Sequence, residues 1–120
     1  MRELTKACPQ YAFIETLILW ILHKQSTYGY KIRKEIKQLT SGDYAPKSGV
    51  IYTILRRMER KGLLKSRWSR GDNKRDKRIY SITKKGEELL KLRLRMMKKR
   101  IRLLEQMVSY YDEVFSEDRL

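Results

Sequence analysis

The chain has 120 residues, which suits one domain with a modest core, or a smaller domain followed by a long helix used for association. Lys and Arg outnumber Asp and Glu by 29 to 14, giving a formal net charge of +15, and the single cysteine, Cys8, excludes an intrachain disulfide. Since the longest apolar run, Tyr11–Leu22, is interrupted by Glu15 and Thr16 and lacks the layout of a secretion signal, we expect a soluble cytoplasmic protein with no membrane partner.

The first predicted helix covers Tyr11–His23, and Pro9 can occupy its first turn. Because its apolar residues cover more than one side, we expect one side to face its own domain and the other to face a second subunit. Trp20 would lie near that junction; core packing is its simplest explanation, and contact with a bound ligand is the alternative. The apolar positions are Phe13, Ile14, Leu17, Ile18, Ile21 and Leu22.

The second predicted helix covers Tyr28–Leu39, with Ser26 or Thr27 as its N-terminal cap. Thr40–Lys47 collects Ser, Gly, Asp and Pro, which is typical of a loop, and Ser48 is the expected cap of the next helix. Helix, loop and helix in this order predict a helix-turn-helix. The apolar positions of the second helix repeat at helical spacing and are Ile32, Ile36 and Leu39.

The third predicted helix, Ser48–Lys61, separates apolar from cationic residues and is the candidate recognition helix. Arg can pair in a bidentate way with guanine edges or phosphate, hydroxyl groups can bond phosphate, and Gly permits close backbone approach. A solvated basic face is the alternative reading. The buried stripe is predicted to be Ile51, Ile54, Leu55 and Met58, with Glu59 near its boundary. The outer face carries Gly49, Thr53, Arg56 and Arg60, flanked by Tyr52 and Arg57.

Two strands are expected after Gly62, which is predicted to end the third helix. Leu64–Ser69 and Arg78–Ile82 alternate as strands do, and the loop between them contains Gly, Asp and Asn, which favour a tight reversal. Trp68 and Tyr80 would lie on the paired strands, where cross-strand aromatic packing is the default expectation and base stacking by Trp68 is the alternative. The cations placed to follow a DNA backbone are Lys74, Arg75, Lys77 and Arg78.

The last predicted helix starts at the cap Thr83 and carries an unbroken heptad seam, which Met107 and Val114 widen. A second helix has to cover this seam, and homodimerisation is the simplest source of that helix. A helix folded back on its own domain is the alternative. We therefore predict a DNA-binding domain over residues 1–82 and a dimerisation helix over residues 83–120. The seam consists of Leu90, Leu94, Met97, Ile101, Leu104, Val108, Tyr111 and Phe115.

The positive charge is concentrated in one contiguous part of the chain. Residues 56–102 hold 20 Lys and Arg against 5 Asp and Glu, while the remaining residues hold 9 of each kind. A charge of this density is expected to bind a polyanion through counterion release, in a salt-dependent way. We therefore expect double-stranded DNA as the partner and the nucleoid as the location.

Three stretches carry a family resemblance: Tyr28–Ile32 (YGYKI), Ser48–Leu64 (SGVIYTILRRMERKGLL) and Arg78–Gly86 (RIYSITKKG). Over about residues 11–90 the chain resembles the PadR-type winged-helix transcriptional regulators. The resemblance implies a mainly α fold with a small β-hairpin (α+β), in which a winged helix-turn-helix domain precedes a long C-terminal dimerisation helix. It also implies a homodimer, formed by the first and last helices, that binds a two-fold-related operator and usually represses.

The chain departs from the family pattern at two places. Thr53 stands where the family often has Pro, which can alter the first turn of the recognition helix but leaves its register intact. Some small members bind aromatic or drug-like effectors between the subunits through a Trp of the last helix, whereas no Trp lies between residues 83 and 120 here. An effector therefore stays unknown, with Trp20, Tyr110 and Tyr111 as the remaining candidate linings.

The candidate site is a DNA-binding surface, and no catalytic, metal or cofactor site is expected. His23 lies beside Lys24 with no evident acidic or thiol partner, and the sequence has neither a metal-ligand cluster nor a Gly-rich phosphate loop. We therefore predict a DNA-binding regulator; the rivals are an architectural DNA-binding protein and a winged helix that binds an acidic protein. The candidate DNA-binding residues are Tyr28, Lys47, Ser48, Gly49, Tyr52, Thr53, Arg56, Arg57, Arg60, Lys74, Arg75, Lys77 and Arg78.

Overall fold

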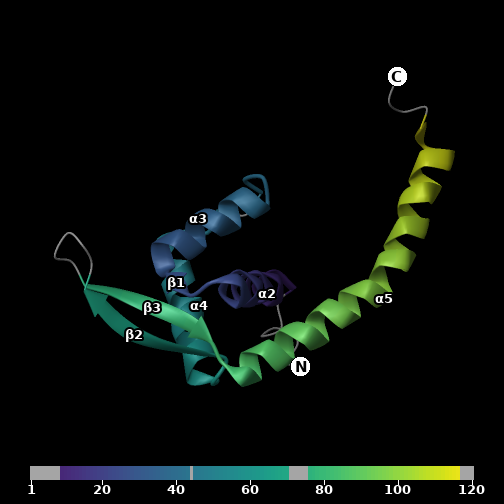
Figure 1. The fold of residues 1–120 in the computed structure, drawn as a ribbon. Helices are drawn as coiled ribbons and strands as arrows, with labels where there is room; N and C mark the ends of the chain where they lie inside the picture. The colour runs from purple at the N-terminus through teal and green to yellow at the C-terminus, as the bar shows by residue number, and fades with distance from the viewer. Residues whose placement is uncertain (1–8, 44, 71–75, 117–120) are drawn as a thin grey trace, which may run out of the picture. The chain divides into compact units, whose positions relative to one another are not determined.

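A computed structural model describes residues 9–43, 45–70 and 76–116 of the chain (Figure 1). The chain divides into two compact units, residues 1–90 and residues 91–120, and the first includes the opening turns of the last helix. The domain boundary predicted between residues 82 and 83 stays a prediction. The elements in chain order are α2 (Pro9–Lys24), β1 (Thr27–Tyr28), α3 (Gly29–Leu39), α4 (Ser48–Arg60), β2 (Leu64–Arg70), β3 (Asp76–Ile82) and α5 (Lys84–Val114).

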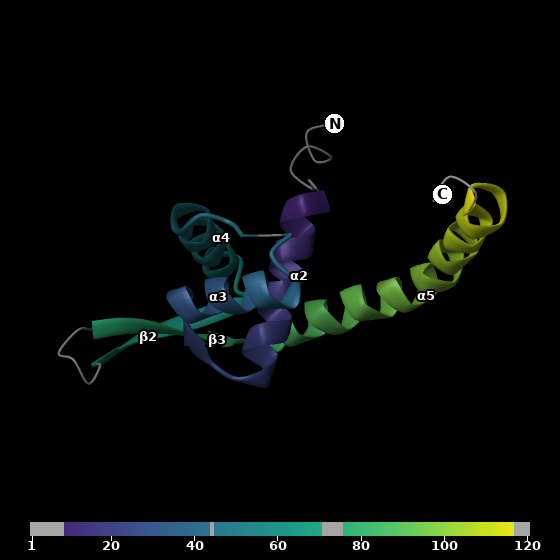
Figure 2. The same ribbon diagram turned by 90° about the horizontal axis from the view of Figure 1, so that it is seen from above.

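The sheet has three antiparallel strands in the order β1, β3, β2 (Figure 1). Figure 2 shows the paired strands β2 and β3 side by side. The predicted hairpin is confirmed, and both of its strands extend farther toward the loop than their sequence patterns indicate. The two-residue strand β1 was not predicted; it pairs Thr27 with Tyr80 and Tyr28 with Ile79. The first unit is thus a helix-turn-helix joined to a small sheet.

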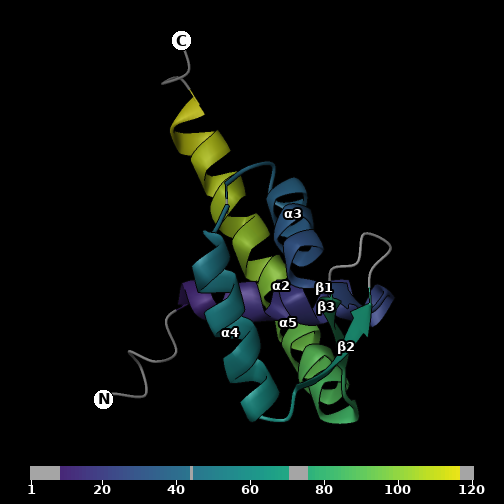
Figure 3. The same cartoon turned by 90° about the vertical axis from the view of Figure 1, so that its left-hand side faces the viewer.

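The core of the first unit lies between the helices and the sheet. α2 and α4 each pack against α3, and Figure 3 shows α2 running across both helices. The predicted buried stripe of α4 is confirmed, because all four of its side chains are at most 2% exposed. Of the apolar positions of α3, Ile32 and Ile36 are buried, whereas Leu39, in the last turn, is 41% exposed.

Two predicted helix caps are wrong, and each is displaced by a competing backbone interaction. α3 begins after Tyr28 because Thr27 and Tyr28 pair with β3, while the Ser26 hydroxyl bonds that of Ser81 at 2.8 Å. α4 begins after Lys47, whose carbonyl oxygen accepts the amides of Val50 and Ile51, so Ser48 is already the first helical residue.

The predictions for Gly62 and Thr83 are confirmed. Gly62 follows the last turn of α4 with φ of +81°, a left-handed conformation that suits glycine. Thr83 caps α5 by accepting the amide of Gly86 on its Oγ1 at 3.1 Å. The same Oγ1 lies 2.6 Å from the carbonyl oxygen of Gly62 and 3.0 Å from that of Leu63. One hydroxyl therefore joins the start of α5 to the turn that ends α4.

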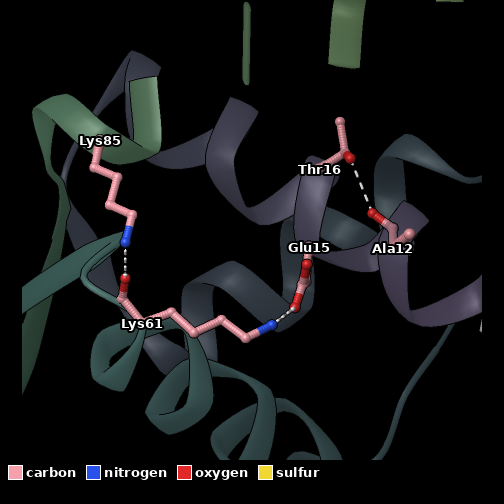
Figure 4. A network of polar contacts seen from close by, with 5 residues as sticks. All are labelled: Ala12, Glu15, Thr16, Lys61 and Lys85. Carbon is pink, nitrogen blue, oxygen red and sulfur yellow. Dashed lines mark hydrogen bonds and ion pairs between the residues drawn. The ribbon is translucent and has the colours of Figure 1, made fainter. Parts of the chain in front are cut away.

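Further contacts strengthen this joint, which we define as the turn Lys61–Leu63 with the first turn of α5. The ammonium group of Lys85 donates to the carbonyl oxygen of Lys61 at 2.8 Å, and Lys61 Nζ lies 3.7 Å from the buried carboxylate of Glu15 on α2 (Figure 4). Gly86 is buried against the Leu63 carbonyl oxygen, where an added Cβ would clash with backbone. Three elements thus meet at one short turn.

The second unit consists mainly of the helical residues of α5 beyond Leu90. Leu90 is buried at 4% exposure, whereas the seven later residues of the predicted seam are between 37% and 60% exposed in the single chain. Within the part of the chain that is described, no helix combines the length and apolar character needed to cross a membrane.

Candidate nucleic-acid interface

The outer face of α4 is exposed and carries the residues predicted for it. Gly49, Tyr52, Thr53, Arg56 and Arg60 all lie at the surface, opposite the buried stripe. The Thr53 hydroxyl donates to the carbonyl oxygen of Gly49 at 2.9 Å, so its proton is used within the first turns of the helix while its oxygen can still accept. This face presents guanidinium groups, hydroxyl groups and, at Gly49, backbone that no side chain covers.

Arg57 differs from the other arginines of α4. Its guanidinium carbon lies 5.7 Å from the centre of the Tyr11 ring of α2, and the side chain is half-buried. A cation held over an aromatic face stabilises the packing of two helices. Arg57 therefore has a structural contact in addition to its predicted role at DNA.

Tyr52 is placed by a close approach to Gly29 at the start of α3. A Cβ added at Gly29 would lie 2.5 Å from Cε1 and 2.8 Å from the hydroxyl oxygen of Tyr52, so only glycine leaves room for this ring. The side chain of Tyr52 is 37% exposed. The glycine of the Tyr28-Gly-Tyr sequence thus fixes a predicted contact residue of α4 from a different helix.

The loop-side half of the β2–β3 hairpin is cationic and is joined to α4. Arg78 donates through Nε to the Ser66 hydroxyl at 2.8 Å, and Ser66 donates to the Glu59 carboxylate at 2.8 Å. A second guanidinium nitrogen of Arg78 lies 3.8 Å from Glu59. The chain of contacts fixes the hairpin relative to α4, and Glu59 offsets part of the charge of Arg78.

Trp68 and Tyr80 lie on the paired strands, as expected, but they do not lie opposite each other. In the observed register Trp68 lies opposite Arg78, and Tyr80 lies opposite Ser66. Tyr80 is buried in the core, whereas Trp68 is 63% exposed with the guanidinium carbon of Arg78 5.4 Å from its ring centre. Of these two aromatic residues, Trp68 is therefore the one at the surface, and it is paired with a cation.

A surface hollow of about 610 Å³ lies where β1, the start of α3, α4 and the hairpin meet. It brings together five of the predicted DNA-binding residues: Tyr28, Tyr52, Arg56, Lys77 and Arg78. Its other lining residues are Gly29, Tyr30, Trp68 and Tyr80. Gly29 and Tyr30 were missed as site residues, because a surface aromatic and a glycine at a helix start carry no periodic signal in the sequence.

Most of the other predicted contact residues lie on the surface outside the hollow, and two lie outside the described residues. Lys47 and Ser48 are exposed at the N-terminal end of α4, and Arg60 is exposed near its C-terminal end. Lys77, which lines the hollow, is exposed, and its ammonium nitrogen lies 4.2 Å from the centre of the Tyr28 ring. Lys74 and Arg75 fall outside the described residues.

Burial raises the pKa of the Tyr80 hydroxyl above its ordinary value of 10.0, because the charged phenolate would lose its hydration there. The neighbouring Arg78 acts in the opposite direction and lowers it in part. Tyr80 therefore lines the hollow as a neutral phenol at physiological pH.

His23 has an acidic partner, contrary to the expectation from sequence. Its Nε2 lies 3.1 Å from a carboxylate oxygen of Glu87, at the start of α5 and 64 residues away. The contact could not be read from local spacing, and it joins α2 to α5. Across the described ranges, His, Cys, Asp and Glu form no group of three suited to a metal ion.

Comparisons with known proteins agree with this architecture. The pattern of the "Transcriptional regulator PadR-like family" matches residues 18–92. The transcriptional regulator YqjI of Escherichia coli is 32% identical over 77 residues, which make up 64% of this chain and 35% of that protein. The chain therefore spans about a third of the length of this curated relative.

Solved structures show the same fold. A PadR family transcription regulator from Clostridium difficile has a TM-score of 0.72 at 28% identity, covering 80% of this chain and 98% of that chain. Bacillus subtilis PadR in complex with operator DNA has a TM-score of 0.62 at 26% identity, covering 68% of this chain and 47% of that chain. The predicted winged helix-turn-helix with a long C-terminal helix is thus confirmed.

Proposed function

This chain belongs to the PadR-like family of transcriptional regulators, and on that premise we propose that it binds a two-fold-related duplex operator as a homodimer and represses transcription. Such a protein acts at the nucleoid. The observation that carries the proposal is the exposed outer face of α4 beside the cationic loop-side half of the hairpin. A helix of this kind reads base edges in the major groove, while cations on either side hold the phosphates.

The residues proposed to read bases are those that project from the middle of α4. Arg56 is exposed there, and Thr53 and Tyr52 lie in the preceding turn. Lys47 and Ser48 at the start of α4, Tyr28, and Lys77 and Arg78 are proposed to contact phosphates, because amides and cations at these positions suit an anion without reading sequence.

The apolar residues of α5 support the homodimer. In the single chain the seam from Leu94 to Phe115 is exposed, and a helix surface of this length does not stay in water. A second exposed stripe, with successive steps of seven, four, three and four residues, runs beside the seam through Met96, Leu103, Met107, Tyr110 and Val114. In a two-fold dimer the two α4 helices would enter successive major grooves about 34 Å apart.

The test is selection of bound sequences from a random duplex pool at near-physiological salt, with competitor DNA present to suppress counterion-driven binding. We expect enrichment of an inverted repeat whose half-sites are centred about 10 base pairs apart. Tight binding without any enrichment would overturn sequence-specific reading.

An architectural role is the second candidate, and the charge distribution favours it. The whole formal excess of +15 lies within residues 56–102, enough to hold any duplex. The two candidates differ in the ratio of specific to random affinity, which is about 1,000-fold or more for a dedicated regulator and near one for an architectural protein.

A further inference from the structure

We propose that the hollow between β1, α3, α4 and the hairpin binds a nucleotide whose base is not paired in a duplex. The base would stack on the exposed rings of Trp68 and Tyr30, and the phosphate would lie at Arg56, Lys77 and Arg78. The hollow, at about 610 Å³, lies within the range of about 300–1,000 Å³ that is usual for small-molecule sites.

The walls of the hollow are held in place before any ligand arrives. Tyr52 rests on the backbone of Gly29, where no Cβ could be accommodated without moving the ring. Arg78 is fixed by Ser66 and Glu59 through contacts of 2.8 and 3.8 Å. A preformed site loses little side-chain freedom on binding, which favours a small ligand.

The aromatic content of the hollow exceeds what phosphate contacts require. Five of its nine lining residues are aromatic, and Trp68 and Tyr30 are 63% and 58% exposed. In a duplex each base is covered by its neighbours, so a surface ring has no base face to meet. Stacking on an unpaired base tolerates any base, because every base has a π face. The rings therefore suit a free nucleotide or a single strand.

The charge of the hollow favours phosphate over a simple carboxylate. Arg56, Lys77 and Arg78 line it, and none of its described lining residues is acidic. Glu59, close to Arg78, offsets one charge, which leaves about two positive charges. A phosphate monoester carries about two negative charges near neutral pH and offers three acceptor oxygens, whereas a monocarboxylate carries one charge.

A ligand in the hollow would compete with operator DNA, because both would use Tyr52, Arg56, Lys77 and Arg78. This regulatory consequence rests on the proposed function. The binding of the nucleotide does not, and it can be measured without DNA.

The experiment uses the full-length chain with Trp20→Phe, which leaves Trp68 as the only tryptophan. Fluorescence of Trp68 is recorded while adenosine 5′-monophosphate is added, with ribose 5-phosphate, inorganic phosphate and adenosine as matched probes. We expect saturable quenching by the nucleotide, and an affinity at least about tenfold higher than that of phosphate or adenosine, because only the nucleotide has both parts.

Variants in the same background locate the binding. Arg56→Gln is expected to weaken nucleotide binding about tenfold by removing a charged donor, and Tyr30→Ala is expected to weaken it at least about fivefold. Lys77→Gln is the second charge variant if Arg56→Gln does not fold. Lys65→Gln is the matched control, because Lys65 is an exposed cation of β2 that does not line the hollow.

Competition then separates the two sources of a nucleotide. If a short oligothymidylate single strand binds with no higher affinity per nucleotide than the monophosphate, the ligand is a free nucleotide; if it binds far more tightly, the ligand is a strand. Either result supports the proposed chemistry. Quenching that does not saturate, or equal affinities for phosphate and nucleotide, would overturn it, whatever the binding to operator duplex.

Discussion

Arg56 and Lys77 line the same hollow but come from different elements, so their removal should have different effects on DNA binding. Arg56→Ala is expected to lower the affinity for the cognate operator by about 1–3 kcal/mol and to relax sequence preference, because α4 is the element proposed to read bases. Lys77→Ala is expected to weaken cognate and random duplexes about equally. Gel shifts at one salt concentration measure, for each variant, the ratio of its affinity to that of the native chain on the cognate duplex and on the random duplex.

Equal losses for both variants on both duplexes would count against base reading by Arg56. A control comes from Lys65→Ala on β2, which removes a charge outside the hollow and should change either affinity by far less. Circular dichroism of each variant establishes that the helices are retained.

Tyr80 gives the fold a dependence on alkaline pH. Because burial raises the pKa of its hydroxyl in the folded state above 10.0, the neutral phenol stabilises the fold fully below about pH 10, and this contribution is lost as pH rises through the folded-state pKa. Tyr80→Phe lacks the titrating group. We therefore expect the native chain to lose unfolding free energy relative to this variant above about pH 10, as measured by urea denaturation. A pH-independent difference would contradict the assignment.

At the scale of single residues, the sequence predicted positions that follow a helical period and missed those set by distant partners. The stripe of Ile51, Ile54, Leu55 and Met58 is buried as expected because period and burial coincide. The contact of His23 with Glu87 and the position of Trp68 opposite Arg78 depend on tertiary packing and strand register. Neither leaves a signal in local spacing.

At the scale of elements, the clearest prediction is dimerisation through the apolar seam of α5. Ile101→Asp with Leu104→Asp would bury charge in the seam, so we expect a monomer or an aggregate in place of a dimer. Light scattering gives the molar mass. Arg102→Asp with Gln106→Asp adds two acids to the same helix outside both apolar stripes and should leave the dimer intact. An unchanged dimer in the seam variant would refute the assignment.

The long elements were predictable and the short ones were not. α4 and α5 follow apolar periods over several turns and α2 is a long apolar segment, whereas β1 is two residues long and exists only because β3 pairs with it. The same pairing moved the cap of α3 to Tyr28. In the candidate site, the outer face of α4 was predictable from its period, but Tyr30 and Gly29 join it only through the way that α3 is packed.

At the scale of the whole molecule, the localised charge predicts how DNA binding responds to salt. Affinity for a random duplex is expected to fall steeply between 50 and 200 mM salt, by about 1,000-fold or more if six or more phosphates are contacted. Lys77→Gln should lower the slope of log affinity against log salt by about one. Fluorescence anisotropy of a labelled duplex measures this slope for the native chain and for the variant. Weak binding at all salt concentrations would favour the rival in which the basic face binds an acidic protein.

The joint at Lys61–Leu63 has a mechanical consequence. The Lys61 carbonyl oxygen accepts a hydrogen bond from the Lys85 ammonium group, and the carbonyl oxygens of Gly62 and Leu63 accept from the hydroxyl and the amide of Thr83. These hydrogen bonds hold the end of α4 directly to the start of α5. A rotation of the first turn of α5 is therefore transmitted directly to α4 through these hydrogen bonds. Twisting the start of α5 by a few degrees would change the pitch at which α4 meets its target.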